Sequence, residues 1–441
     1  MTETLIQAAQ FFLSLSFLIV LHELGHFIPA KLFNTRVEKF YLFFDPYFSL
    51  FKKKIGGTEY GIGWLPLGGY VKISGMIDES MDTEHLNAEP QPWEFRSKPA
   101  WQRLIIMVGG VAVNVLLAMV IYAMILFNWG DDYLKTENLK YGIECSDLAK
   151  EIGFQNGDKI LTIDGVYYEN FSDIPEAILI SSASEVLVDR NGETVSISIP
   201  SNLIERFIDK NESRFIGMAW PYIAQKFDDA SVAEAAGVLT GDQLIAINGK
   251  EALYFSEYVN TLPSLAGQEI RLSVLRGLDT LHLDMLLGDN GKIGVYYVPP
   301  TELITYDHRD YGFFESFPAG TAMAIDKLDS YVQQMKLIFN PETGAWKGLG
   351  GFISIGKQYS PEWDWFSFWN FTAFLSIILA FMNILPIPAL DGGHVMFLLG
   401  EMITGRKPSD KLLEYAQVTG FLILIALLLL ANGNDIIKLF N

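Results

Sequence analysis

The chain has 441 residues, of which 50% are hydrophobic, and its formal net charge is −20. The negative charge is concentrated between Asn128 and Trp365, where 36 acidic residues face 18 basic ones. A nucleic-acid partner is not expected, because phosphate backbones are bound by basic surfaces. The single cysteine, Cys145, excludes an internal disulfide and a cysteine-based zinc site.

Apolar runs near both ends of the chain predict four membrane-spanning helices, because a run of roughly 20 apolar residues crosses a bilayer as a helix. A signal peptide is not expected, since the first four residues are acidic rather than basic. The predicted spans run from about Leu5 to Phe33, Leu104 to Trp129, Phe366 to Ile387 and Val418 to Ala431.

Lysine and arginine in two loops predict the orientation of these spans. The loop after the first span carries Arg36, Lys39 and the run 52–54, and the loop before the last span carries Arg406 and Lys407. Such residues favour the cytoplasmic side of a membrane. Both loops are therefore expected in the cytoplasm, with the acidic middle region and both termini outside.

The first span contains the polar motif His22-Glu23-Leu24-Gly25-His26. Side chains four residues apart lie on one face of a helix, so both imidazoles can bind one zinc ion. Glu23 then stands where a general base for peptide hydrolysis is needed. Ionisable groups inside a lipid-spanning helix are costly, which favours a functional interpretation over a buried polar cluster that joins helices.

The segment after the first span, from Thr58 to Ile73, is rich in glycine and aromatic residues. It predicts strands with a tight turn at Pro66 to Gly69, and thus a β-hairpin. The hairpin could be an ordinary soluble ribbon or could rest at the membrane surface, where tryptophan and tyrosine are favoured.

The acidic middle region contains an internal repeat. The pattern of residues 153–165 returns at 237–249, so that each glycine and the aspartate recur 84 residues later. A glycine-rich turn, an alternating strand and an Asp/Asn-Gly turn form one repeated unit. The pattern resembles two tandem PDZ domains, which accept an extended peptide at a strand edge. The alternative is a pair of β-rich spacers that bind no peptide.

Between the repeat and the third span, apolar residues at helical spacing predict an amphipathic helix from Phe317 to Asn340. It could lie at the membrane interface or pack as an ordinary helix.

The third span ends in the stretch 383–394, which carries two prolines and Asp391. A catalytic zinc ion needs a third protein ligand, and Asp391 is the acid nearest the apolar part of this helix. His394 is a rival ligand, ranked lower because a histidine at a helix end beside the cytoplasm is common.

Taken together, these motifs resemble the bacterial site-2 proteases of the regulator-of-sigma-E protease type, over nearly the whole chain. The resemblance rests on His-Glu-x-x-His in the first span, Asn-x-x-Pro-x-Pro-x-Leu-Asp-Gly in the third, Pro-Leu-Gly-Gly-Tyr-Val-Lys at 66–72, and the PDZ-like pair. The stretches 109–114 and 351–355 resemble two further elements of the family, with Val111 and Phe352 in place of family prolines.

The resemblance implies an intramembrane zinc metalloprotease of the bacterial inner membrane. It implies zinc held by His22, His26 and Asp391, with Glu23 as the catalytic base. It also implies roles near the substrate, and the residues concerned are Asn383, Asn114, Gly68, Gly69 and Tyr70. Single-pass membrane proteins such as anti-sigma factors, and remnant signal peptides, are the implied substrates.

The expected fold is a bundle of four transmembrane helices with a membrane-associated β-hairpin and two extracytoplasmic PDZ-like domains that contact peptides or proteins. The expected domains, in order, are the first helix (1–33), the hairpin segment (34–100), the second helix (101–129), the PDZ-like domains (130–215 and 216–300), a linker with an amphipathic helix (301–365), the third helix (366–392), and a cytoplasmic loop with the fourth helix (393–441).

Three rival functions remain open from the sequence. The chain could be a membrane-tethered PDZ scaffold with a structural metal, or a membrane zinc protease that cuts extramembrane peptides. A metal transporter is a weaker rival, because the fourth span offers no polar position. If the chain is an intramembrane protease, the PDZ-like pair is expected to exclude substrates with bulky outer domains.

Overall fold

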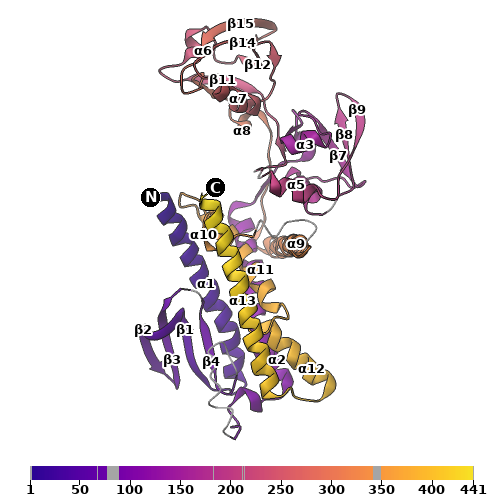
Figure 1. Ribbon diagram of the computed structural model, residues 1–441. Coiled ribbons are helices and arrows are strands. Elements are labelled where there is room, and N and C mark those ends of the chain that lie inside the picture. The colour runs from indigo at the N-terminus through magenta and orange to yellow at the C-terminus, as the bar shows by residue number, and fades with distance from the viewer. Residues whose placement is uncertain are drawn as a thin grey trace. The chain divides into compact units, whose positions relative to one another are not determined.

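The computed structural model divides the chain into two compact units (Figure 1). The structure describes residues 2–66, 68–76, 89–181, 183–210, 212, 214–340 and 349–440. The helical unit comprises Met1–Gly130, Asp310–Lys336 and Lys347–Asn441. The β-rich unit comprises Asp131–Arg309 with Leu337–Trp346.

Within the described residues, four helices of the helical unit are long and apolar enough to cross a membrane, which confirms the four predicted spans. Both chain ends lie at the same end of this unit (Figure 1), as an even number of spans requires. The four helices are α1 (Thr2–Leu32), α2 (Ala100–Trp129), α11 (Trp365–Ile384) and α13 (Asp410–Phe440).

Several helix ends differ from the predicted spans, and two of these differences follow from the residue types at the ends. Helix α11 ends at Ile384 rather than Ile387, because Pro386 and Pro388 cannot continue a helix. Helix α13 begins at Asp410, well before the apolar run at Val418, because polar residues extend a helix without adding hydropathy. Three shorter elements complete this part of the unit: η2 (Phe95–Ser97), α10 (Phe352–Gly356) and α12 (Asp391–Thr404).

Close backbone contact joins α1 to α2. A Cβ atom added at Gly25 would lie 2.4 Å from the carbonyl oxygen of Gly109, so only glycine fits here. Small residues at such contacts let membrane helices approach and gain van der Waals packing.

Helix α9 (Phe313–Phe339) covers the segment for which an amphipathic helix was predicted. Its Ala324 belongs to a buried cluster with Tyr122 of α2 and Ala373 of α11. Gly320 meets the backbone of Ala123, where a Cβ atom would come within 2.3 Å of the amide nitrogen. Helix α9 therefore packs against the spanning helices.

A four-stranded sheet follows α1 in the chain, with strand order β2-β3-β1-β4. Strand β3 runs parallel to β1, and β4 runs antiparallel to β1 on its other side. The predicted hairpin with a turn at Pro66 to Gly69 is therefore wrong: that segment crosses over β1, and its Leu67 lies outside the described residues. The strands are β1 (Val37–Leu42), β2 (Phe44–Ile55), β3 (Thr58–Leu65) and β4 (Tyr70–Ile73).

A hairpin is present one connection earlier, between β2 and β3. Its turn is Gly56-Gly57, and both residues have positive φ, at 57° and 88°. Two-residue hairpin turns need such φ values, which glycine adopts without strain. The predicted turn at Pro66 to Gly69 was thus assigned to the wrong pair of glycines.

The first half of the β-rich unit is a three-stranded sheet and a two-stranded ladder around one core. Its elements are η3 (Thr136–Asn138), β6 (Ile143–Cys145), α3 (Asp147–Glu151), β7 (Lys159–Ile163), η4 (Phe171–Asp173), α4 (Ile174–Leu179), β8 (Glu185–Arg190), β9 (Glu193–Ser198), α5 (Leu203–Asp209) and β10 (Ile216–Met218). Cys145 is buried in this core, and burial raises the pKa of its thiol to about 12.

The second half is built around a larger sheet with its own core. Its elements are β11 (Tyr222–Phe227), α6 (Val232–Ala235), β12 (Gln243–Ile247), β13 (Lys250–Glu251), α7 (Phe255–Thr261), η5 (Leu262–Leu265), β14 (Glu269–Arg276), β15 (Asp279–Leu286), β16 (Val295–Tyr297) and α8 (Pro300–Leu303).

The sequence repeat is also a structural repeat. Asp158 accepts hydrogen bonds from Arg190, and Asp242 accepts the matching bonds from Arg276. Each arginine also donates to the carbonyl of the first repeat glycine, Gly153 or Gly237. In each half, therefore, a buried aspartate and an arginine guanidinium hold the glycine turn by an equivalent set of hydrogen bonds.

A short antiparallel ladder, hereafter the neck, brings the two ends of the β-rich unit together. Strand β5 (Asp131–Tyr133) pairs with β17 (Asp307–Arg309). Lys135 reinforces the neck with an ion pair to Asp307 at 3.2 Å. The chain thus enters and leaves the segment Asp131–Arg309 of this unit at neighbouring positions.

Candidate metal centre

His22 and His26 stand one turn apart on α1, in the predicted register. Their Nε2 atoms lie 3.2 Å from each other. Both side chains are largely shielded, with 12% and 9% of their surfaces exposed. The helical spacing therefore places both imidazoles on the same side of α1.

Helix α2 fixes the orientation of both rings. Nδ1 of His26 lies 2.8 Å from the carbonyl oxygen of Ile106, so it donates its proton there and leaves a lone pair on Nε2. Gly110 faces the rings, and a Cβ atom there would lie 2.4 Å from Nε2 of His26 and 2.6 Å from Cε1 of His22. The two histidine rings can therefore take up these positions only if residue 110 is glycine.

Asp391 reaches the histidines from the turn that follows α11. Ala389 adopts a φ of 83° in this turn, and α12 begins at Asp391. Gly392 and Gly393 lie against the turn, where Cβ atoms would come within 2.2 Å and 2.6 Å of its backbone. The two glycines let the chain fold back sharply and point the carboxylate of Asp391 inward.

Three donor atoms converge at this place. Oδ2 of Asp391 lies 3.3 Å from Nε2 of His22 and 3.2 Å from Nε2 of His26. In the described part of the chain, these residues form the one group of three such side chains able to share a metal ion. Two histidines and a carboxylate are a typical ligand set of catalytic zinc.

The spacing fits zinc. Bonds of about 2.0–2.1 Å in a tetrahedral arrangement place ligand atoms about 3.3 Å apart, which is the separation seen here. Oδ2 of Asp391 is buried and has no hydrogen-bond partner. Burial of an unpartnered carboxylate oxygen costs free energy unless a cation balances its charge.

Glu23 lies beside the histidines and faces β4. Its carboxylate accepts a hydrogen bond from the backbone of Val71. Gly69 approaches it as well, with a Cβ position 3.6 Å from Cγ of Glu23. The acid is therefore held between the two histidines and the edge of the four-stranded sheet.

Two asparagines contact His22. Nδ2 of Asn383 lies 3.3 Å from Nε2 of His22, and Nδ2 of Asn114 lies 3.2 Å from Nδ1. Oδ1 of Asn114 is buried and has no hydrogen-bond partner. A half-turn of this amide would place the oxygen against Nδ1, which would then donate its proton and leave Nε2 free for a metal.

The other three predicted site residues lie where the chain crosses over β1. Gly68 has a φ of 151° and meets the ring of Phe44. Tyr70 begins β4, and its hydroxyl donates to Asp45 at 2.8 Å. Gly69 thus lies close to Glu23, and the Tyr70 hydroxyl is bound to Asp45 within the sheet.

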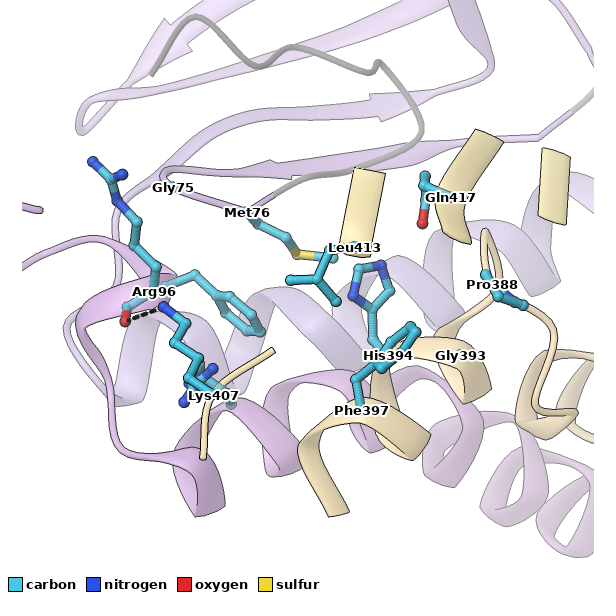
Figure 2. Close-up of a pocket in the computed structure, with 12 residues that line it drawn as sticks. Gly75, Met76, Arg96, Pro388, Gly393, His394, Phe397, Lys407, Leu413 and Gln417 are labelled. Atoms are coloured by element: carbon cyan, nitrogen blue, oxygen red, sulfur yellow. Dashed lines mark hydrogen bonds between the residues drawn. The ribbon is translucent and has the colours of Figure 1, made fainter. Parts of the chain in front are cut away.

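His394 is not among the three side chains whose donor atoms converge. It lines a pocket with a cavity volume of about 60 Å³, together with Pro388, Phe397 and Lys407 (Figure 2). The rival assignment of His394 as the third ligand therefore has no support from the geometry.

Comparison with known proteins also indicates a metalloprotease. The sequence profile of peptidase family M50 matches residues 10–427. The chain belongs to peptidase family M50. As an M50 peptidase it is a membrane zinc metalloprotease of the site-2 type.

Relatives of this M50 peptidase match over almost their full lengths. A protein of Xylella fastidiosa named as a zinc metalloprotease is 28% identical, with 96% of this chain and 97% of the relative covered. Protease RseP of Yersinia pestis is 27% identical, with 98% of each covered. The regulator of sigma E protease of Haemophilus influenzae is 27% identical, with 97% and 98% covered.

Several groups at the centre of this M50 peptidase escaped the sequence analysis. The carbonyl of Ile106 and the backbone of Val71 carry no side-chain signal that a sequence pattern could reveal. Gly110 belongs to a Gly-Gly pair and lies four residues before Asn114. This spacing puts Gly110 and Asn114 on one helix face, and it could have predicted that both lie near the histidines.

Proposed function

We propose that His22, His26 and Asp391 hold the zinc ion of this M50 peptidase and that Glu23 is its general base. The convergence of the three donor atoms, with an unpartnered buried carboxylate oxygen among them, carries the proposal. In this assignment Asn114 fixes the tautomer of His22, and Ile106 fixes that of His26.

Bound zinc supplies a Lewis acid that polarises the peptide carbonyl and activates water at neutral pH. Glu23 takes the proton from the attacking water and delivers it to the leaving amide nitrogen. The hydrogen bond from Val71 keeps the carboxylate aimed at this position. Asn383, beside Nε2 of His22, is placed to hold the substrate carbonyl as charge develops on it.

The substrate is proposed to be a transmembrane segment unwound into an extended strand. A helix protects its own peptide groups by internal hydrogen bonds, so it must open before hydrolysis. Strand β4 ends the described sheet on the side of Glu23. Such an edge offers backbone groups to which an unwound segment can pair.

The proposed orientation places Asp391 and the sheet toward the cytoplasm of a bacterial inner membrane and the β-rich unit outside, by the distribution of lysine and arginine. The two repeats are proposed to be PDZ-like domains that contact peptides or proteins. Single-pass membrane proteins, including anti-sigma-factor-like proteins and remnant signal peptides, are the proposed substrates in regulated intramembrane proteolysis.

The test is cleavage of a single-pass substrate in proteoliposomes with parallel zinc analysis. Glu23→Gln is expected to keep zinc and to lose cleavage by at least about 100-fold, since removal of a general base costs about 10²–10⁴. Asp391→Asn is expected to lose both zinc and cleavage. Wild-type cleavage by Glu23→Gln would contradict the assignment of Glu23 as the general base.

Mapping the cut site separates the two protease assignments. Cleavage within the apolar segment of the substrate is expected from a metal held beside β4 within the helical unit. Cleavage confined to extramembrane peptides would contradict the intramembrane proposal.

A further inference from the structure

A buried ion pair joins α2 to α12 away from the donor atoms. Nη2 of Arg103 lies 2.5 Å from Oε1 of Glu401. The side chains are 8% and 16% exposed, and Nε of Arg103 donates to the carbonyl of Lys98 at 2.9 Å. The pair is thus anchored to the segment that leads into α2.

Neither charge stabilises its own helix. Arg103 lies in the first turn of α2, and Glu401 lies in the last turn of α12. A cation at a helix N-terminus and an anion at a C-terminus both oppose the helix dipole. Burial of both charges adds a desolvation cost. The benefit of the pair must therefore come from docking one helix on the other.

The two docked helices carry different parts of the metal centre. Helix α2 supplies the Ile106 carbonyl that orients His26 and the glycine at 110 that faces both rings. Helix α12 begins at Asp391. Leu398 of α12 packs in one buried cluster with Ile106 and Met107 of α2.

Glu401 follows Asp391 on the same rigid element. Ten residues of helix extend about 15 Å at 1.5 Å per residue, so the pair clamps the far end of α12. Apolar packing at Leu398 is non-directional and would tolerate sliding or rotation. An ion pair with defined partner atoms fixes where α12 lies along α2.

We infer that Arg103 and Glu401 are positioning residues that set the register of α12 on α2 and thereby hold Asp391 in reach of the two histidines. The inference rests on the proposed role of Asp391 as third zinc ligand. Hydrogen-bond partners behind metal ligands typically affect metal affinity or activity by about 10–100-fold, and the ion pair acts on the same ligand through a rigid helix.

The test measures zinc retention of the full-length protein in detergent during dialysis against a chelator, together with kcat and KM. Arg103→Gln and Glu401→Gln are each expected to lose zinc about 10-fold more readily and to lower kcat, with KM little changed. Arg103→Lys, which keeps the charge, is expected to retain more zinc than Arg103→Gln. Arg271→Gln, which removes an exposed ion pair with Asp284, is the control and is expected to behave as wild type.

The double variant Arg103→Glu/Glu401→Arg, in which the two charges are exchanged, tests whether the ion pair itself is required for zinc retention. It restores the pair and places each charge favourably for its helix dipole, so recovery of zinc retention is expected. Single variants that retain zinc as the wild type does, while Asp391→Asn loses it, would overturn the positioning role. Retention by Asp391→Asn would instead overturn the proposed ligand set. Zinc retention is also measured for each variant at a temperature equally far below its own Tm. If the single variants then retain zinc as the wild type does, the pair is merely structural and the inference is overturned.

Discussion

Gly110 faces both imidazole rings from α2, and any larger residue there would occupy the place of a ring. A Cβ atom would stand 2.4 Å from Nε2 of His26, closer than carbon and nitrogen can approach without bonding. Gly110→Ala is therefore expected to displace His26 and to weaken zinc binding by about 10-fold or more. Zinc content after dialysis checks this.

Gly400→Ala is the control for Gly110→Ala. It adds the same methyl group to α12 at a position with no atom within 4 Å of the new Cβ. Zinc content and cleavage should be unchanged. Equal zinc content in the Gly110→Ala protein would show that the rings do not need this space.

Asp242 and Arg276 make the stability of the second repeat dependent on pH. Burial opposes the charge of Asp242 more than any other single effect, but the hydrogen bonds from Arg276 and the Leu239 amide, together with the charge of Arg276, outweigh it and lower the pKa below its ordinary value of 3.8. A depressed pKa contributes stability that is present above the ordinary value and is lost as pH falls through the folded value. The contribution should therefore fade only below about pH 4.

Asp242→Asn is expected to remove this dependence and to destabilise β12 and its turn by about 2 kcal/mol, since a buried acceptor pair is lost. Hydrogen exchange of the β12 amides in the full chain measures it. Asp284→Asn, which removes an exposed ion pair with Arg271, should have little effect. A matching loss in both variants would contradict the special role of the buried aspartate.

At the scale of elements, α13 meets the turn that carries Asp391 at one glycine. A Cβ atom at Gly420 would lie 1.4 Å from the carbonyl oxygen of Pro388. Gly420→Ala must push α13 away or shift this turn, and a displacement of about 1 Å at a catalytic group can cost about 100-fold in rate. Cleavage of a single-pass substrate is the measurement.

Gly433→Ala provides a matched control in the same helix. It gains the same helix propensity, about 1 kcal/mol, and its Cβ would meet no atom within 4 Å. Normal cleavage by this variant together with a defect in Gly420→Ala would assign the effect to the contact with Pro388. Equal activities would show that the contact is dispensable.

The sequence predicted the elements that depend on local pattern and missed those that depend on pairing. Hydropathy located the four spans, and the spacing of His22 and His26 predicted that their rings would meet. The order of the strands around β1 was not predictable, because parallel pairing of β1 with β3 leaves no mark in either segment. The partners of His26 at Ile106 and of Glu23 at Val71 are backbone groups, which every residue possesses.

For the whole molecule, the proposed role of the β-rich unit is to exclude substrates with bulky outer domains. Replacing residues 136–304 by a short flexible linker keeps both strands of the neck. The shortened enzyme is expected to cut untrimmed single-pass proteins that the full chain rejects. Gel analysis of trimmed and untrimmed substrates in proteoliposomes measures the ratio of the two cleavage rates.

Asp242→Asn in the full chain serves as a comparison, since it weakens one repeat and leaves the unit in place. It should still reject untrimmed substrates at neutral pH. An unchanged requirement for prior trimming in the shortened enzyme would refute the filter.

The neck also makes the β-rich unit a removable insert. Paired strands place the entering and leaving backbones about 5 Å apart, so the gap between α2 and α9 can be closed by a hairpin of a few residues. Any foreign domain with adjacent termini, such as a fluorescent reporter or a binding module of chosen specificity, could occupy the same place. The inserted domain would then determine which substrates reach the protease. The helices that carry the proposed zinc ligands would keep their native connections.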